Sequence, residues 1–553
     1  MKENRFTILL VKQATENSTQ NLIPRVLSGL RQGCNRAKSS YTKPMHRGFF
    51  YTLFLVCLTA FANTERPNII VIYTDDQGYG DVSALNPESK FETPNLDRLA
   101  REGMIFTDAH SSDTVCTPSR YGLLTGRYSW RTELKRGVFG AERPCLIPDN
   151  RLTLASLLRK QGYRTGMVGK WHLGMDFPNE RANRDWTQPV TDMPLDKGFD
   201  YFYGIPASLN YGVLAWFEGR FAKVPPTQYT QKKPNQIAFS DYRIKPPYDT
   251  NTRNLSPANP KTGQIKGQLE IAPDFVDSEC LTRFTDKAID WIRDQKPDTT
   301  EAPPFFLYLA YTSPHKPVIP LEQFRGQGQA GAYGEFVIET DWHIGRLLKT
   351  LDEQGIKDNT LIVFTSDNGP ETTWKQRKKT FQHSSAHIYR EGKRSIYEGG
   401  HRVPFLVRWP AQVKAATTWD KPVCQTDLIA TLADLLDVPL PADAGEDSHS
   451  FLPALLSKPQ SEKRPPLIHH GISGRFAIRS GDWKLVMEAK KASRELYNLK
   501  DDPSETHDLL TEQPEKAKQL LFDLNRIIRD GRSTPGAAAT NDTPLWVDLT
   551  WMK

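Results

Sequence analysis

The stretch NIIVIYTDD (Asn68–Asp76) joins a short run of apolar residues directly to two carboxylates. Three other apolar runs also lead straight into polar residues: RTGMVG (164–169), FFLYLAY (305–311) and LIVFTS (361–366). Runs of this length, rich in Ile, Val and Phe, are typical of strands buried on both faces of a mainly parallel sheet. Ligands bind beyond the carboxyl ends of the strands in such sheets. We therefore expect the polar residues after all four runs to lie at one edge of the sheet.

Helical patterns fill the intervals between these runs, at Thr93–Gly103, Thr153–Gly162 and Phe336–Gly355. Each ends at a glycine, the residue that most readily adopts the left-handed conformation of a helix cap. Strands that alternate with helices predict an α/β domain of three layers, with the sheet between two layers of helices.

The span 176–272 departs from this alternation, because it is rich in Pro, Tyr, Trp, Asn and Lys and contains no long periodic segment. An insertion of this length commonly forms a lid or a wall beside a substrate, although the composition is equally compatible with a packed surface excursion. We interpret it as a lid or substrate wall.

The pattern changes again near residue 440, where Pro439, Pro441 and Gly445 follow a helical segment. Beyond this point, residues 475–487 and 494–499 are typical of antiparallel strands, and a helix is predicted over residues 515–529. The sequence therefore predicts an α/β domain over residues 63–440 and a small C-terminal α+β domain with an antiparallel sheet over residues 441–553.

The first 62 residues differ from the rest. Residues 1–45 are polar and basic, whereas GFFYTLFLVCLTAFA (48–62) is almost entirely apolar, is too short to span a bilayer, and ends in the small-x-small pattern of a cleavage site. We expect a secretory leader, with Met45 as an alternative start, and an exported protein, periplasmic or extracellular, without a stable membrane span. An uncleaved anchor or a buried helix is the alternative.

The leader also carries the excess of positive charge. It holds nine of the 72 Lys and Arg residues and two of the 65 Asp and Glu residues, so the remaining chain is formally neutral. Nothing in the charge therefore favours a nucleic-acid partner.

Four oxygen donors follow two of the predicted strands: Asp75, Asp76, Asp367 and Asn368. Hard oxygen ligands of this kind are those that Ca²⁺ or Mg²⁺ prefers. Carboxylates crowded at one edge repel one another, and a divalent cation removes that cost. The sequence therefore predicts a metal site, with helix caps and surface turns as the alternative.

Cys116 stands directly in front of Thr-Pro-Ser-Arg and a predicted helix. Pro118 suits the first turn of a helix, and Arg120, four residues after the cysteine, lies on the same helical face. Backbone N–H groups and a guanidinium at the start of a helix favour an anion, although a plain buried cysteine is the usual alternative. Further cations and titratable imidazoles that suit transfer of a tetra-oxyanion are Lys170, His172, His315 and Lys393.

The segment CTPSRYGLLTGR (116–127) resembles the signature of type I sulfatases, Cys-x-Pro-Ser-Arg-x-x-Leu-x-Thr-Gly, and GYRTGMVGKWHLG (162–174) resembles their second signature. Other matching segments follow in the family's order between about Asn68 and Pro410: NIIVIYTDDQGYGD, SPHKP, FTSDNGP and GKRSIYEGGHRVPFLVRWP. The resemblance implies an alkaline-phosphatase-like fold for the larger domain and an arylsulfatase-like hydrolysis of sulfuric esters.

The resemblance also implies that a formylglycine-generating or sulfatase-maturating enzyme oxidises Cys116 to Cα-formylglycine (3-oxoalanine), whose aldehyde hydrates to a diol. A thiolate is a poor partner for a hard cation, and a diol is a better one. By resemblance, one Ca²⁺ ion is held by five residues and polarises both the diol and a sulfate oxygen. These residues are Asp75, Asp76, Cys116, Asp367 and Asn368.

The roles that the resemblance implies for the other residues are those of covalent catalysis. Formylglycine at residue 116 attacks sulfur and forms a covalent sulfate hemiester, while His315 donates a proton to the leaving alcohol. His172 then takes the remaining hydroxyl proton, and sulfate leaves. Arg120 and Lys170 orient the diol, and Lys393 balances charge on the sulfuryl group.

Two alternatives remain open. Hydrolases of phosphomonoesters, phosphodiesters or phosphonates share this fold, but those with two zinc ions need additional Asp and His ligands, and Asn368 stands where some of them place a histidine. Outside enzymes, the alternative is a sulfated-glycan-binding protein whose Cys116 is never matured.

The aromatic insertion and the basic loop Trp374–His387 indicate walls for a sulfated carbohydrate, with small aryl sulfates also accepted. A solvated charged loop is an equally good interpretation of the second segment. His401 and the pair His469 and His470 are further candidates for the site, but no spacing argument places them there.

Overall fold

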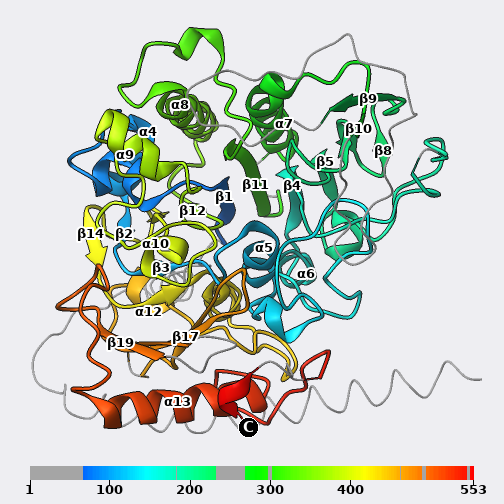
Figure 1. Cartoon of the computed structure of the whole chain (residues 1–553). Helices are drawn as coiled ribbons and strands as arrows, with labels where there is room; N and C mark the ends of the chain where they lie inside the picture. The colour runs from blue at the N-terminus through cyan, green and yellow to red at the C-terminus, as the bar shows by residue number, and fades with distance from the viewer. Residues whose placement is uncertain are drawn as a thin grey trace, which may run out of the picture. The chain divides into compact units, whose positions relative to one another are not determined.

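The four apolar runs are neighbouring strands of one large sheet in the computed structural model (Figure 1). They are β1 (Asn68–Asp75), β4 (Arg164–Lys170), β11 (Phe305–Pro314) and β12 (Thr360–Ser366). β1 pairs in parallel with β11 on one side and β12 on the other, and β11 pairs in parallel with β4. Every residue of β1, β11 and β12 is buried, which explains why these strands lack polar alternation.

Shorter strands extend the sheet on both sides, and most of them are antiparallel to their neighbours. Beyond β12 come β13 (Phe405–Arg408), β2 (Met104–Phe106) and β14 (Thr417–Trp419); beyond β4 come β5 (Tyr201–Ile205), β7 (Phe217–Glu218) and β8 (Phe221–Ala222). β12 and β13 are antiparallel, as are β5 and β7, whereas β4 and β5 are parallel. The sheet is therefore mixed with a parallel centre, as predicted.

Helices cover both faces of this sheet. One layer holds α4 (Pro94–Glu102), α7 (Cys280–Asp294) and α8 (Gly331–Glu353), and the other holds α5 (Cys116–Thr125), α6 (Leu154–Lys160) and α11 (Leu428–Leu435). α7 and α8 pack on β11 and on each other, and α6 packs on β4 and on α5. Figure 1 shows α7 and α8 above the sheet and α5 and α6 below it. The predicted three-layer α/β architecture is confirmed.

The structure describes residues 66–181, 183–231, 268–296, 302–460, 463–487, 494–544 and 549–552. The predicted leader lies outside these residues. Residues 66–553 form one compact unit, and no helix within the described part is long and apolar enough to cross a membrane. The cysteines of the described residues, Cys116, Cys145, Cys280 and Cys424, are all free.

The insertion contains strands that the sequence did not indicate. β5, β7 and β8 join the edge of the large sheet, while β6 (Val213–Leu214), β9 (Gln228–Gln231) and β10 (Gln268–Ile271) form a small sheet of their own. Strands of two to five residues are too short for their alternation to be recognised in a sequence. A role as lid or substrate wall stays a prediction, and residues 232–267 lie outside the described part.

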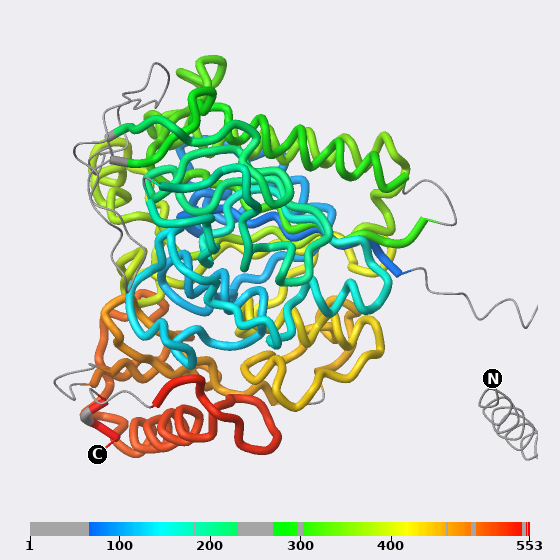
Figure 2. Tube along the Cα trace, turned by 90° about the vertical axis from the view of Figure 1, so that its right-hand side faces the viewer, coloured from blue at the N-terminus to red at the C-terminus, as the bar shows by residue number. Residues whose placement is uncertain are grey.

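The C-terminal part of the chain combines an antiparallel sheet with a helix. β16 (Leu467–His470), β17 (Phe476–Ser480), β18 (Trp483–Met487) and β19 (Arg494–Asn498) form an antiparallel sheet in chain order. α13 (Pro514–Arg529) packs on β17 and β18, and both views show this helix in red beside the sheet (Figures 1 and 2). The predicted antiparallel sheet is confirmed, whereas the boundary near residue 440 stays a prediction.

Short elements connect these parts of the structure. They are β3 (Ala109–His110), which pairs with β15 (Val423–Cys424), and the helices α9 (Trp374–Phe381), α10 (Glu398–His401) and α12 (Leu452–Leu455). The predicted basic loop is thus largely the helix α9.

Gly126 ends α5 in the left-handed conformation, with φ of 66°, and a Cβ at this position would lie 2.3 Å from Cγ2 of Ile429. We expect Gly126→Ala to lower the free energy of unfolding by about 2–5 kcal/mol, because backbone strain and overpacking add. Gly355→Ala is the control, since Gly355 has φ of 68° but a Cβ there would meet nothing within 4 Å. Urea denaturation should show a loss of only about 1–2 kcal/mol for the control; equal losses would contradict the packing at Gly126.

Candidate active site

The predicted metal-binding residues meet at the carboxyl ends of β1 and β12. Asp75 is the last residue of β1, and Asp76 follows it in the left-handed conformation, with φ of 66°. The N–H of Asp367 donates to the carbonyl of Thr74 at 3.1 Å, and the N–H of Asp76 donates to Oδ1 of Asp367 at 3.0 Å. These bonds join the two strand ends, so the carboxylates of three buried aspartates lie together.

The carboxylate of Asp76 lies close to three other predicted site residues. Its Oδ1 accepts hydrogen bonds from Nδ2 of Asn368 at 2.8 Å and from Nζ of Lys393 at 2.5 Å. Its Oδ2 lies 3.8 Å from Nε2 of His315. Oδ2 of Asp76 and Oδ1 of Asn368 are buried and have no hydrogen-bond partner among the described residues. Buried oxygens without a donor are costly, and a cation would satisfy both.

Cys116 is the first residue of α5 and faces the same carboxylates. Its Sγ lies 3.5 Å from Oδ1 of Asp75 and 3.5 Å from Nζ of Lys393. Burial raises the pKa of the Cys116 thiol well above its usual value. The thiol is therefore protonated at neutral pH, and an unmodified Cys116 is a weak nucleophile.

Arg120 and Lys170 surround the cysteine with positive charge. The guanidinium of Arg120 donates to Oδ2 of Asp367 at 3.0 Å and to the carbonyl of Lys170 at 3.1 Å. The ammonium of Lys170, at the end of β4, donates to Asp75. Both side chains are completely buried, so solvent does not screen their charges.

The two histidines each have one ring nitrogen fixed by a backbone carbonyl. Nε2 of His172 donates to the carbonyl of Phe139 at 2.9 Å, which leaves Nδ1 buried and without a partner among the described residues. Nδ1 of His315 donates to the carbonyl of Lys316 at 2.6 Å, which leaves Nε2 toward Asp76. Burial lowers the pKa of His172 well below its usual range and that of His315 to about 3. Both imidazoles are therefore neutral in the free site.

The donor set fits a hard divalent cation. Asp75, Asp76, Cys116 and His315 offer ligand atoms that all lie within 4.8 Å of one another. Asp367 is not part of this tight group, and its oxygens accept hydrogen bonds from the N–H of Asp76 and from Arg120. Burial and the neighbouring charge of Asp75 raise the pKa of Asp367 to about 7. A divalent cation would relieve this crowding of carboxylates, and carboxylate and amide oxygens are the ligands that Ca²⁺ prefers.

Residues 67–438 match the family model described as Sulfatase. The chain belongs to the sulfatase family. Residues 387–532 also match a model described as the C-terminal part of N-sulphoglucosamine sulphohydrolase. The resemblance of the Cys116 segment to type I sulfatases, members of the alkaline-phosphatase superfamily, is thereby confirmed.

Relatives of this sulfatase cover most of its length. It is 34% identical over 486 residues to the N-acetylgalactosamine-6-O-sulfatase of Bacteroides thetaiotaomicron, covering 83% of this chain and 92% of that one. Human arylsulfatase A is 30% identical over 485 residues, covering 83% and 86%. A solved structure from work on the metabolism of multiple glycosaminoglycans by B. thetaiotaomicron superposes with a TM-score of 0.70 at 32% identity, covering 84% of this chain and 99% of that one. The protein is therefore an enzyme of the sulfatase class.

Residues near the sulfatase site that the sequence did not single out come from the insertion and from the segment after β12. The ring of Tyr211 lies 5.4 Å from that of His172. Arg394, in the left-handed conformation with φ of 78°, donates to Glu371 at 2.8 Å, and Lys316 lies 3.4 Å from the same carboxylate. Arg394 and Glu371 follow Lys393 and the SDNGP segment directly, but no spacing rule assigns them a chemistry.

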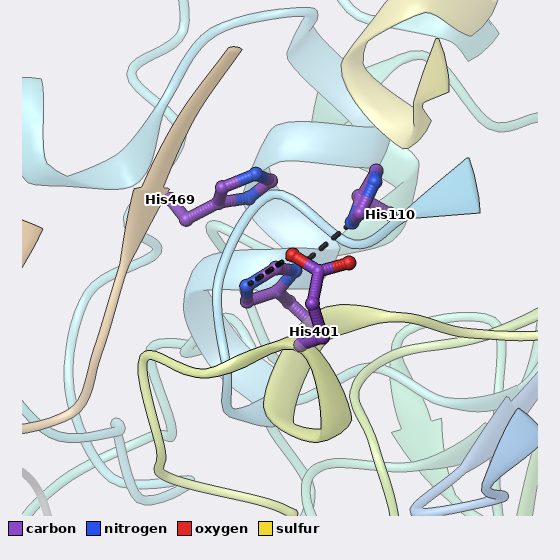
Figure 3. A group of neighbouring side chains, drawn as sticks. His110, His401 and His469 are labelled. Carbon is purple, nitrogen blue, oxygen red and sulfur yellow. Dashed lines mark hydrogen bonds and ion pairs between the residues drawn. The ribbon is translucent and has the colours of Figure 1, made fainter. Parts of the chain in front are cut away.

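The other candidate histidines lie apart from Cys116. His401 contacts His110, with 2.9 Å between their Nδ1 atoms, and its ring stacks on that of His469 at 3.8 Å (Figure 3). His470 instead contacts Asp113, three residues before Cys116. Sγ of Cys116 instead contacts Asp75 and Lys393.

Proposed function

We propose that this sulfatase releases inorganic sulfate from a sulfated carbohydrate and that residue 116, as formylglycine, is the nucleophile. The observation that carries the proposal is the setting of Cys116. Its thiol is buried and protonated, yet it stands between Asp75 and Lys393 in a site of hard oxygen ligands. A hydrated aldehyde suits such a site better than a thiol does, because its oxygens match the ligands that hard cations prefer.

The residues that would hold Ca²⁺ are Asp75, Asp76, Asp367, Asn368 and residue 116. When bound, the ion supplies Lewis-acid polarisation of a sulfate oxygen and of the nucleophile. Support for this assignment comes from the two buried oxygens of Asp76 and Asn368 that have no partner among the described residues.

The side chains divide the proton transfers between them. One hydroxyl of the hydrate would give its proton to the carboxylate of Asp75, whose Oδ1 lies 3.5 Å from Sγ of Cys116, as it attacks sulfur. The bond from sulfur to the alcohol oxygen would break, and the alcohol would take a proton from His315. His315 is neutral in the free site, and the negative charge of a bound sulfate ester favours its protonation. The second hydroxyl then gives its proton to Nδ1 of His172, the aldehyde reforms, and sulfate leaves. Arg120 and Lys170 orient the hydrate, and Lys393 balances the charge of the sulfuryl group.

A sugar substrate is supported by the side chains beside the site. The aromatic face of Tyr211, from the insertion, suits contact with a sugar ring. The side chain of Arg394 is 36% exposed, and its guanidinium offers charge to a carboxylate or a second sulfate group. Similarity to an N-acetylgalactosamine-6-O-sulfatase points the same way, and similarity to arylsulfatase A supports acceptance of small aryl sulfates.

Two further parts of the proposal concern the export and the maturation of the chain. We propose that the leader directs export and that a formylglycine-generating or sulfatase-maturating enzyme converts Cys116. The signature around Cys116 supports the second point, and the apolar run with its cleavage pattern supports the first.

The function is tested by comparing matched nitrophenyl sulfate and nitrophenyl phosphate in calcium, with protein whose formylglycine content has been measured by mass spectrometry. We expect kcat/KM for the sulfate to exceed that for the phosphate by at least about 100-fold, because the site is complementary to one transition state. Sulfate release from sulfated saccharides is then measured by ion chromatography. Faster cleavage of the phosphate would favour the phosphoester alternative, and fully converted protein without activity on either would favour a binding role.

A further inference from the structure

The loop Ser111–Val115, here called the nucleophile loop, leads directly into Cys116 and is organised by Asp113. α5 has no side-chain cap at Val115. Instead, Oδ1 of Asp113 accepts a hydrogen bond from the N–H of Thr114 at 2.7 Å. The backbone carbonyl of Asp113 accepts hydrogen bonds from the hydroxyls of Ser111, at 2.6 Å, and Ser119, at 3.0 Å. One residue therefore ties the loop to the first turn of the helix that begins at the nucleophile.

The second oxygen of this carboxylate is held by the C-terminal sheet. Nδ1 of His470, at the end of β16, lies 2.6 Å from Oδ2 of Asp113, across 357 residues of sequence. The side chains of His470 and Asp113 are only 3% and 2% exposed, so no water competes for this hydrogen bond. A carboxylate only accepts, so Nδ1 of His470 is the donor when Asp113 is ionised.

Other anchors of the nucleophile loop include hydrogen bonds between backbone groups. The carbonyl of Thr114 accepts the N–H of Arg394 at 2.9 Å, and the N–H of Ser111 donates to the carbonyl of His401 at 2.9 Å. Substitution of these residues does not remove backbone hydrogen bonds. Within the described residues, the bond from His470 is thus a side-chain anchor of the loop that a single substitution can delete.

The neighbouring cluster of His110, His401 and His469 has a different character (Figure 3). The ammonium of Lys484 already supplies this cluster with a positive charge. Its Nζ lies 2.9 Å from Glu398, 2.8 Å from Glu505 and 3.1 Å from Nε2 of His401. The rings of His401 and His469 are stacked within 8° of parallel, so one metal ion cannot lie in the plane of both. The cluster therefore packs β16 against α10. The histidine that contacts the nucleophile loop is His470, the residue after His469 on β16.

We infer that His470 is a positioning residue of the sulfatase reaction: through Asp113, it fixes the nucleophile loop so that residue 116 faces Asp75 and Lys393. The inference rests on the proposed function. A nucleophile displaced by about 1 Å loses on the order of 100-fold in rate. Lys393, which balances the charge of the sulfuryl group, lies on another segment and keeps this role. The expected signature is therefore a fall in kcat with little change in KM.

A matched pair of substitutions tests this inference. In His470→Asn, the amide nitrogen replaces Nδ1, so the donor to Asp113 is kept, and we expect kcat within about 3-fold of wild type. In His470→Gln, the amide nitrogen replaces Nε2 and the donor is misplaced, so we expect kcat to fall by about 10- to 100-fold at nearly constant KM. Rates are divided by the formylglycine content of each protein, measured by mass spectrometry.

His469→Gln is the control, because His469 is also buried on the same strand and its ring stacks on that of His401. We expect its kcat to stay within about 3-fold of wild type. A second readout needs no activity: hydrogen exchange of the peptide that spans residues 111–120 is expected to be faster in His470→Gln than in His470→Asn.

The outcomes separate the two proposals. Equal kcat values for His470→Asn and His470→Gln, an equal loss in His469→Gln, or unchanged hydrogen exchange in His470→Gln would overturn the role of His470 and leave the sulfatase reaction intact. Fully converted wild-type protein that hydrolyses no sulfate ester would instead overturn the proposed function.

Discussion

Cys116→Ala is expected to lower kcat/KM for nitrophenyl sulfate by at least about 10⁴-fold, because it removes the atom on which the nucleophile is built. The residual rate would come from the cations that still bind the sulfate group. The fold should survive, since Cys116 is a small side chain whose Sγ makes contacts at 3.5 Å and anchors no packing cluster. Steady-state kinetics and the thermal midpoint of unfolding are measured on the same preparations.

Cys280→Ala provides the matched control, because Cys280 is equally buried, at the start of α7, and belongs to the apolar core. It is expected to keep wild-type kcat. Wild-type protein that carries unmodified Cys116 provides the second arm, and it should be as inactive as Cys116→Ala, because burial holds the thiol in its protonated form. Retention of a tenth or more of the activity in either would show that formylglycine is not the nucleophile.

Much of the site could be predicted from the sequence because the strands that lead into it are long. β1, β11 and β12 are long and buried throughout, so their apolar runs stand out and their polar successors, such as Asp75 and Asp367, can be assigned to one edge. The nucleophile segment is equally visible, because its proline and arginine have fixed spacings from Cys116 on a helix. Local sequence patterns are enough to predict a site residue where the residues next to it in the chain form the pattern.

The contacts that the sequence did not reveal join segments without a local pattern. β5 and β7 are too short for a period to appear, so the path of the insertion to Tyr211 could not be foreseen. The bond from His470 to Asp113 spans 357 residues, and neither side chain is distinguished in sequence from an ordinary buried polar residue. The sequence grouped His401 with His469 and His470, but the two neighbouring histidines have different contacts. Successive residues of a strand point to opposite faces, so His469 stacks on His401 whereas His470 contacts Asp113.

Removal of Ca²⁺ is expected to lower kcat by at least about 100-fold and to lower the thermal midpoint of unfolding, with both recovered when calcium is restored. The physical reason is the concentration of buried charge at the ends of β1 and β12. Without a cation, Oδ2 of Asp76 and Oδ1 of Asn368 have no partner among the described residues, and Asp367 is held near Asp75 with its pKa raised to about 7. At a calcium concentration 100 times Kd, the bound ion stabilises the fold by about 2.7 kcal/mol.

Asp76→Asn separates this effect from general stabilisation by salt. The variant lacks one anionic ligand, so calcium should shift its thermal midpoint much less than it shifts that of the wild type. Asp341→Asn is the control, because Asp341 is a buried carboxylate on α8 that accepts the N–H of Leu96 at 2.8 Å and so joins α8 to α4. Its calcium-dependent shift should equal that of the wild type. Unchanged kcat and thermal midpoint after treatment with a chelator would rule out the metal site. The charges of the lysines and arginines alone would then stabilise the crowded carboxylates.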